Sequence, residues 1–290
     1  MESQMRKYRG SMINDFLTCR KKAWWRWFRP IKLEPNKRNK NLEIGDLTHQ
    51  CLHIWYENLQ ACVEDRLLLV EMHLNGILEN ALTVPEYPAD ELKQLEASVA
   101  EAKALMKALG RDFPTEDFTI VSAEQTVVAE LVPELNIWLQ ATFDGIIQYK
   151  RPMLIFEHKT CGQTKGPLIR SYLRSPQIIS YVWLGKKLHP EIQGGLYNFL
   201  AKLTNPVVFR EPTVIGAKIV ARWLESTVAT AWEIEECLQK DYWKENLGKC
   251  VTLHGDCPYK PLCESYSDVT LRDYRQAAED FTRENYTVIE

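Results

Sequence analysis

Residues 142–160 read Thr-Phe-Asp-Gly-Ile-Ile-Gln-Tyr-Lys-Arg-Pro-Met-Leu-Ile-Phe-Glu-His-Lys-Thr. Two short apolar runs joined by Lys-Arg-Pro predict two strands with a turn between them. Because alternate residues of a strand share a face, Glu157 and Lys159 are expected to project together while His158 points the other way. If the strands pair across the turn, Asp144 lies on the neighbouring strand near Glu157. Two carboxylates beside one ammonium predict a site for a hard divalent cation, with a catalytic lysine next to it.

Length and composition predict an ordinary globular protein. The chain has 290 residues, 45% of them hydrophobic, enough for one large domain or for a domain with an added helical part. No run approaches about 18 apolar residues and the first residues lack the apolar core of a signal peptide, so a cytoplasmic protein without a membrane span is expected. The eight cysteines then favour metal binding over disulfides.

The net charge of −3 hides two positive blocks. Residues 1–40 contain twelve Lys and Arg against three Asp and Glu, and residues 145–190 contain eight against one. Both blocks adjoin the residues singled out for chemistry, as expected if a polyanion crosses the site. The alternative is that both are solvated charged surfaces.

Two amphipathic segments precede the strands. Residues 11–29 have apolar residues at helical spacing, with Ser11 as a plausible N-cap. Their aromatic rings alternate with Lys and Arg and could stack on bases, although such rings more often form core. Residues 42–56 predict a second helix, on which Gly45 and His49 lie on one side. The glycine there would let a strand or a phosphate approach the imidazole.

Two ionisable residues are weaker candidates for the site. His53 shares the helical face of His49, but a helical histidine is more often a structural residue than a ligand. Glu124 lies on the strand before the site and could be an additional acid, although a strand glutamate more often faces solvent.

The remaining pattern predicts helices and strands in alternation. A helical stretch over residues 65–110 breaks near 85–88, and three strands in meander order follow. A helix begins at Ser175, where Gln177 and Tyr181 share one face. A long helix is expected over residues 216–247. These features predict four regions: 1–40, basic and aromatic; 41–112, helical; 113–215, the core; and 216–290, the last helix and a cysteine-rich segment.

Cys250, Cys257 and Cys263 lie within fourteen residues, in a loop with Gly and Pro. Three converging thiolates suit a soft metal centre with one further ligand. Tetrahedral zinc and an iron–sulfur cluster both fit this ligand type, and the alternative is unliganded thiols. Spacing leaves the fourth ligand open among Cys19, Cys51, Cys62, Cys161, Cys237 and His254.

Taken together, these motifs resemble the RecB-like and Cas4-like branch of the PD-(D/E)XK nuclease superfamily, over most of the chain. The matching elements occur in the family's order and are Gly45 to His49, Asp144, Glu157 with Lys159, and Gln177 to Tyr181. The resemblance implies an α/β restriction-endonuclease-like core, with a central mixed sheet flanked by helices and a helical insertion. It also implies N- and C-terminal segments joined by a cysteine-ligated cluster. For that cluster, a 4Fe-4S centre with zinc as the alternative, the resemblance implicates Cys19, Cys250, Cys257 and Cys263.

The resemblance further implies a Mg²⁺- or Mn²⁺-dependent DNA nuclease. The implied metal ligands are His49, Asp144, Glu157 and the carbonyl of His158. Lys159 is expected to orient the attacking water, and Gln177 and Tyr181 to position the strand. We expect an exonuclease acting on DNA ends or single strands in recombination, repair, phage DNA metabolism or CRISPR adaptation, together with a protein partner from those processes. The alternative is a non-catalytic iron–sulfur or zinc module that binds DNA or a partner through a vestigial site.

Overall fold

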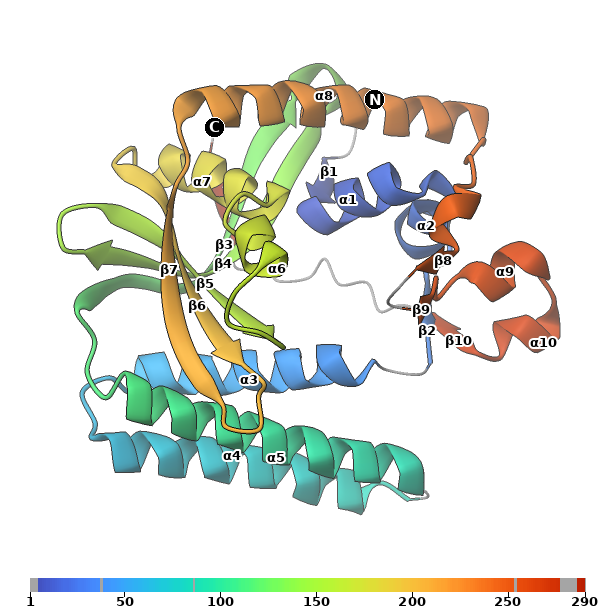
Figure 1. The fold of residues 1–290 in the computed structure, drawn as a ribbon. Coiled ribbons are helices and arrows are strands. Elements are labelled where there is room, and N and C mark those ends of the chain that lie inside the picture. Colours follow the sequence, from blue (N-terminus) through green and yellow to red (C-terminus); the bar gives the residue numbers. More distant parts are fainter. Residues whose placement is uncertain (1–4, 37–38, 86, 253–254, 277–285, 290) are drawn as a thin grey trace. The chain divides into compact units, whose positions relative to one another are not determined.

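The computed structural model describes residues 5–36, 39–85, 87–252, 255–276 and 286–289 (Figure 1). Contacts divide the chain into two compact units, which we describe separately. The site unit consists of residues 39–125 and 142–217, and the terminal unit consists of residues 1–38, 126–141 and 218–290. The division into four regions along the sequence stays a prediction.

The site unit combines a helical layer with a mixed sheet. Its elements are α3 (Lys40–Glu57), α4 (Val63–Thr83), α5 (Ala89–Asp112), the first part of β3 (Phe118–Val132), the last part of β4 (Ile137–Tyr149), β5 (Met153–Cys161), α6 (Pro167–Tyr172), α7 (Pro176–Leu188), β6 (Ile192–Ala201) and β7 (Val207–Val214). The helical break predicted near residues 85–88 and the helix after Ser175 are both confirmed. Ser175 caps α7 through a hydrogen bond from the Ile178 amide to its side chain.

Strand pairing in this unit follows the predicted turn. β4 and β5 are antiparallel, with Gly145 opposite Phe156, and the Tyr149 amide donates to the Pro152 carbonyl across the turn at 3.0 Å. β5 pairs with β6 in parallel, and β6 pairs with β7 antiparallel. The sheet is therefore mixed, as the family resemblance implies.

The two faces of this sheet carry different helices (Figure 1). Phe156 belongs to the core that the sheet shares with α3, α4 and α5, where Trp55 and Leu105 are also fully buried. Ile155 points to the other face. Its terminal methyl would stand 2.9 Å from a side-chain carbon added at Gly185 of α7, so a larger residue there would force Ile155 to shift. The alternation of the strand thus directs successive residues of β5 to different helical layers.

The terminal unit joins the two ends of the described chain. Its elements are β1 (Arg6–Arg9), α1 (Gly10–Thr18), α2 (Arg20–Ala23), a π-helical turn (Trp24–Phe28), β2 (Leu33–Pro35), the remainder of β3 and β4 with a 3₁₀ turn between them (Pro133–Leu135), α8 (Ala217–Lys240), a second 3₁₀ turn (Leu247–Lys249), β8 (Val251–Thr252), β9 (Gly255–Asp256), α9 (Lys260–Glu264), α10 (Asp268–Leu271), β10 (Tyr274–Gln276) and β11 (Thr287–Ile289). β1 pairs with β4 and β11 with β3, both in parallel. β10 pairs with β2, and β8 with β9.

Two helix predictions in this unit were wrong. The helix expected over residues 11–29 breaks at Cys19, whose backbone is extended (φ −161°, ψ 115°), and its N-cap position is Arg9, not Ser11. The helix expected to reach residue 247 ends at Lys240, because Asp241 adopts a left-handed conformation with φ 45°, which closes a helix. No helix in the described part of the chain is long and apolar enough to cross a membrane.

Candidate active site and cysteine cavity

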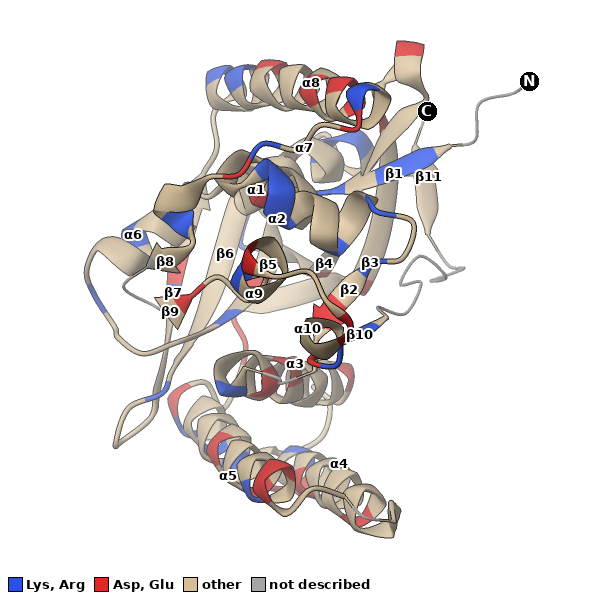
Figure 2. Cartoon of the chain, turned by 90° about the vertical axis from the view of Figure 1, so that its right-hand side faces the viewer, with Lys and Arg blue, Asp and Glu red and all other residues tan. Residues whose placement is uncertain are grey.

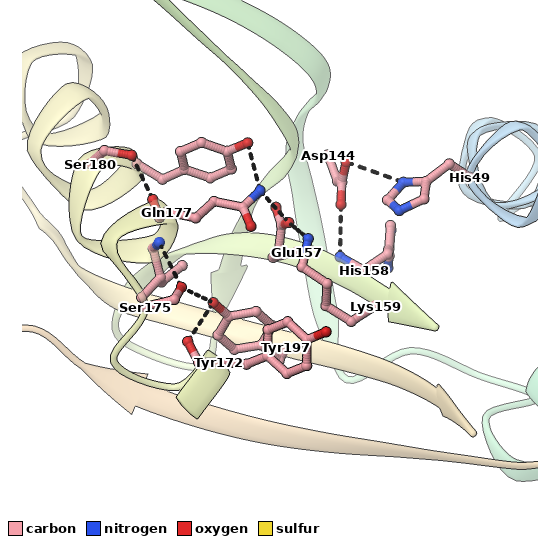
Figure 3. A network of polar contacts seen from close by, with 12 residues as sticks. His49, Asp144, Glu157, His158, Lys159, Tyr172, Ser175, Gln177, Ser180 and Tyr197 are labelled. Carbon is pink, nitrogen blue, oxygen red and sulfur yellow. Dashed lines mark hydrogen bonds and ion pairs between the residues drawn. The ribbon is translucent and has the colours of Figure 1, made fainter. Parts of the chain in front are cut away.

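Glu157 and Lys159 lie together on the α7 face of β5, as the two-residue spacing predicts. The Lys159 ammonium donates to Glu157 Oε1, and the side chains are only 19% and 2% exposed. Gln177 of α7 donates to the same oxygen at 2.9 Å, and its amide nitrogen lies 2.9 Å from the Tyr181 hydroxyl (Figure 3). The glutamate is therefore held from two elements through one oxygen.

Asp144 reaches the same site from β4. The β4–β5 register continues from Gly145 opposite Phe156, which brings Asp144 beside Glu157. Its Oδ2 accepts a hydrogen bond from the His158 backbone amide at 2.7 Å, and its Oδ1 lies 3.4 Å from His49 Nδ1 on α3 (Figure 3). The structure thus brings both carboxylates, the imidazole and the ammonium together.

The His158 side chain lies on the opposite face of β5 from Glu157, as predicted. Its ring stacks on Tyr56 of α3 with centroids 5.2 Å apart and planes 8° apart, and its Nδ1 lies 3.2 Å from Asn198 Nδ2. Only the backbone of His158 faces Asp144. The ring is thus used in packing and hydrogen bonding, and the role of the His158 carbonyl as a metal ligand stays a prediction.

The charges of the site are coupled. Burial and, after it, the Asp144 charge raise the pKa of Glu157 to about 7, although the Lys159 ammonium acts in the opposite direction. For Lys159, burial works against the charged form, but Glu157 outweighs it and raises the lysine pKa. For Asp144, burial is likewise outweighed, here by His49, so its pKa falls. The single positive charge of Lys159 therefore does not offset the effect that burial and the Asp144 charge have on the pKa of Glu157.

His49 and His158 respond to their surroundings in opposite ways. Burial disfavours protonation of His49, but the charge and hydrogen bond of Asp144 outweigh it and raise the pKa. For His158 burial prevails and lowers the pKa to about 3. The His158 ring is consequently neutral at physiological pH. The protonation of His49 depends instead on the nearby charge of Asp144.

The site residues fit a hard divalent cation by two criteria. Carboxylate oxygens with an imidazole and a backbone carbonyl are ligands that Mg²⁺ and Mn²⁺ accept, and Glu157 Oε2 is buried with no hydrogen-bond partner among the described residues. Such an oxygen is costly unless a cation or donor meets it. In the described ranges, no three His, Cys, Asp or Glu side chains enclose a metal position as they stand, so the fit rests on donor chemistry and the unpaired oxygen.

Gly45 lies on α3 one turn before His49, but the described chain does not require a glycine there. A side-chain carbon added at Gly45 would meet only Thr160 Oγ1, at an ordinary contact distance of 3.8 Å. Close approach of the strand is therefore not the reason for this residue.

The two weaker candidates lie together at another place. His53 Nδ1 is 3.6 Å from Glu124 Oε2, and His53 Nε2 is 3.2 Å from Glu57. Both the His53 and the Glu124 side chains are 41% exposed. Glu124 has φ 35°, which is unusual for a strand residue.

The four cysteines implied by the resemblance line one cavity of about 390 Å³ in the terminal unit. They are Cys19, Cys250, Cys257 and Cys263. All eight cysteines are unbridged, and Cys237, which belongs to the same unit, is not among the lining residues. His254 lies outside the described residues.

Backbone and indole groups surround these sulfurs. The Asn246 amide donates to Cys19 Sγ at 3.4 Å, and the Trp25 indole donates to Cys263 Sγ at 3.3 Å. N–H groups directed at sulfur suit thiolate ligands. The predicted helix breaks at Cys19, where the backbone is extended. The Sγ atom of this same residue accepts the hydrogen bond from the Asn246 amide. The donor chemistry and the cavity thus fit a group held by four thiolates.

The two basic blocks differ in how they are used. In residues 1–40, Arg20 pairs with Glu233, Arg6 pairs with Glu235, and Lys22 and Arg26 pair with Asp15. Figure 2 shows Lys and Arg in blue on β1 and α2. Four of the twelve Lys and Arg of this block thus pair with acids of the terminal unit.

The second basic block, residues 145–190, has more Lys and Arg side chains without an ion-pair partner among the described residues. In the part of the chain that the structure describes, Lys165, Arg170 and Arg174 are exposed and have no ion-pair partner. They flank Tyr172 of α6. The phenol of Tyr172 lies near Lys159 and contributes to raising the pKa of that lysine (Figure 3). This segment is the stronger candidate for contact with a polyanion.

Sequence reasoning missed a buried polar set behind the site. Its members are Tyr56, Glu116, Asn198 and Arg210. An available signal was Asn198 inside the apolar run Leu-Tyr-Asn-Phe-Leu and Arg210 at the end of the apolar run Val-Val-Phe, since a buried polar group needs partners.

Comparison with known proteins agrees with this arrangement. A family model described as the PD-(D/E)XK nuclease superfamily matches residues 11–264. A crystal structure from Eubacterium rectale, of a protein provisionally named an exonuclease, superposes with a TM-score of 0.55 at 12% identity, over 86% of this chain and 87% of that chain. No curated protein matches the sequence. At that identity the solved structure shows the fold alone, whereas the family model covers most of the chain and all the motif residues: the chain belongs to the PD-(D/E)XK nuclease superfamily.

Proposed function

We propose that this protein is a Mg²⁺- or Mn²⁺-dependent deoxyribonuclease of the iron–sulfur, RecB-like and Cas4-like branch. The observation that carries the proposal is the convergence of Asp144, Glu157 and Lys159 with His49, around a glutamate oxygen that has no partner among the described residues. Membership of a nuclease superfamily supports the reaction class.

In this proposal His49, Asp144, Glu157 and the His158 carbonyl hold the cation. When bound, a divalent cation polarises a phosphodiester and makes a nearby water a better nucleophile. Asp144 is already oriented for this role, because the His158 amide fixes one of its oxygens.

Lys159 stabilises the charge that develops on the phosphate oxygens and orients the attacking water. Its contact with Glu157 holds the ammonium at the site until a cation competes for that carboxylate. Gln177 and Tyr181 position the strand from α7, and Gln177 also restrains Glu157.

The proposed substrate is DNA, single-stranded or with free ends. Exposed Lys165, Arg170 and Arg174 around Tyr172 support it, because cations with an aromatic ring suit a flexible strand. We propose exonuclease action in recombination, repair, phage DNA metabolism or CRISPR adaptation, in the cytoplasm and with a protein partner of that process.

The cysteine cavity is proposed to hold a 4Fe-4S cluster, with zinc as the alternative. Four thiols that line one cavity support this, as do the N–H donors to Cys19 and Cys263. A centre with these ligands would link positions about 230 residues apart in the sequence, and would so restrict the unfolded chain.

Purified protein incubated with labelled DNA tests the nuclease. Linear single strands, linear duplexes and circular single strands would be compared with Mn²⁺, with Mg²⁺ and with EDTA, using 5′ and 3′ labels on separate samples. We expect cation-dependent loss of linear DNA while the circles survive. Cleavage of circles would show endonuclease action, and binding without cleavage in either cation would favour the non-catalytic module.

A further inference from the structure

Three neighbouring strands place three polar residues side by side behind the site. In the β5–β6 register His158 pairs with Asn198, and in the β6–β7 register Asn198 pairs with Arg210. Laterally paired residues project to the same face of a sheet, here the face covered by α3 and α5. The register alone therefore aligns the three side chains in a row.

Arg210 is fixed at the far end of this row. Its guanidinium binds Glu116 through two nitrogens, at 2.6 and 2.9 Å, and the two side chains are 9% and 5% exposed. It also packs against the Phe113 ring, 3.9 Å from its centroid. A buried two-pronged ion pair of this kind holds the planar guanidinium in one orientation.

The orientation of Arg210 determines every hydrogen bond that follows. Arg210 Nε can only donate, and at 3.2 Å it donates to Asn198 Oδ1. The Asn198 amide nitrogen must then face His158 Nδ1, 3.2 Å away. Because an amide nitrogen only donates, Nδ1 accepts, and the ring hydrogen of His158 is placed on Nε2. The guanidinium thereby selects the imidazole tautomer through one amide.

The row ends at the catalytic aspartate. The His158 ring is clamped between the Asn198 amide and the stacked Tyr56 ring, and the Tyr56 hydroxyl lies 3.3 Å from Arg210. Fixing the ring fixes the His158 peptide, whose amide donates to Asp144 Oδ2 at 2.7 Å. The other oxygen of Asp144 is left facing His49.

We propose that Arg210 and Asn198 are positioning residues of the nuclease site. They hold the His158 ring in the Nε2–H tautomer, and through the His158 peptide they aim Asp144 at the cation position. The inference rests on the proposed function, but it concerns residues that touch neither cation nor DNA. Outer partners of metal ligands typically affect metal affinity or activity by about 10- to 100-fold.

Asn198→Asp is the most direct test, because it keeps the shape and the acceptor for Arg210 but replaces the donor to His158 with an acceptor. Long-range ¹H–¹⁵N spectra of the imidazoles, with the His158 signals identified by their loss in His158→Gln, report the tautomer in metal-free protein. We expect hydrogen on Nε2 in the wild type and on Nδ1 in Asn198→Asp. Mn²⁺ binding measured by electron paramagnetic resonance should weaken about 10- to 100-fold.

A second variant, Arg210→Lys, keeps a cation but removes the two-pronged contact and the fixed donor to Asn198. It should weaken Mn²⁺ binding in the same direction, and lower kcat at limiting Mn²⁺ with little change in the KM for DNA. This variant carries the test if Asn198→Asp does not fold.

Ser98→Ala is the matched control. It removes a buried hydrogen bond to Glu43 in the same unit, so it should lower the melting temperature without moving the tautomer or the Mn²⁺ affinity.

The readouts separate this proposal from the proposed nuclease. Wild-type protein that binds Mn²⁺ but cleaves no DNA would end the nuclease proposal, while the spectra and the metal affinities would still decide the positioning role. Hydrogen on Nδ1 in the wild type would overturn the proposal, as would an unchanged Mn²⁺ affinity in folded Asn198→Asp or Arg210→Lys.

Discussion

In the acid site, the protein supplies nearly all its own polar partners. Asp144 is held by His49 and the His158 amide, and Glu157 Oε1 by Lys159 and Gln177, so a single buried glutamate oxygen stays unpaired among the described residues. The cysteine cavity has few such restraints. Its sulfurs make weak contacts, such as those at 3.4 Å to Cys19 and 3.3 Å to Cys263, around an open volume.

This difference indicates how the folding of each site depends on the metal ion or cluster that it would bind. A site already ordered by its own hydrogen bonds should keep its fold when the cation is absent, and lose only chemistry. A cavity lined by thiols gains its cross-links only from a bound centre, so losing that centre should cost stability. The following experiments test this contrast, beginning with the largest effect.

Removing a side chain from the acid site should abolish cleavage and leave the fold intact. For Asp144→Ala and Lys159→Ala we expect a loss of at least roughly 10²- to 10³-fold, because each removes charge stabilisation at the reacting phosphate. Initial rates on labelled DNA and circular dichroism measure the two properties separately. Glu124→Gln, which changes an exposed acid of the same unit, is the control and should keep wild-type activity. Undiminished cation-dependent cleavage by either alanine variant would remove these residues from the mechanism.

Removing a cavity cysteine should instead affect stability first. Wild-type protein purified without oxygen is expected to be brown, with broad absorbance near about 400 nm, and Cys257→Ser should lose the colour. Its melting temperature should fall by roughly 2 to 4 °C for each kcal/mol lost. Cys62→Ser, at an exposed cysteine that caps α4 in the site unit, should keep the colour and should not lower the melting temperature, because serine also caps helices. A colourless wild type with stoichiometric zinc would assign the cavity to zinc.

Neutralising the exposed arginines within and just after α6 should weaken DNA binding without stopping the chemistry. Arg170→Ala combined with Arg174→Ala should reduce the slope of log affinity against log salt by about 2, if each arginine meets one phosphate. Binding would be measured by fluorescence anisotropy in Ca²⁺, over a range of salt. Lys218→Ala with Arg222→Ala removes the same charge from exposed positions of the terminal unit and should leave the slope unchanged. Equal slopes for the two double variants would exclude α6 as the DNA contact.

Gly45→Ala is expected to give the smallest effect on the fold. The described chain leaves room for the added methyl, and alanine favours a helix interior by up to about 1 kcal/mol over glycine. Thermal unfolding should therefore shift upward slightly. Weaker DNA binding in this more stable variant would indicate that a phosphate, rather than the strand, approaches Gly45. Destabilisation would show that the helix packs more tightly than the contact at Thr160 indicates.

Local sequence patterns predicted much of the fold around the acid site. The alternation in β5 separated Glu157 and Lys159 from His158, and the Lys-Arg-Pro turn predicted the β4–β5 pairing that brings Asp144 alongside, both of which the structure confirms. These relations depend on backbone periodicity and a short turn, which neighbouring residues specify. Helix limits were less predictable. Cys19 and Asp241 end helices whose apolar pattern continues past them, because contacts with distant residues and a left-handed backbone override that pattern.

The sequence by itself determined which chemical groups this protein could bring together: two carboxylates, a lysine and a histidine. Their spacing along the chain places them on particular faces of a strand and a helix. Only the tertiary structure decided what holds them. The row from Arg210 through Asn198 to His158 depends on the registers of three strands, and the shared cavity of the cysteines depends on the packing of both ends of the chain within one unit. Contacts between residues far apart in sequence have no local period, so they follow from packing and not from pattern.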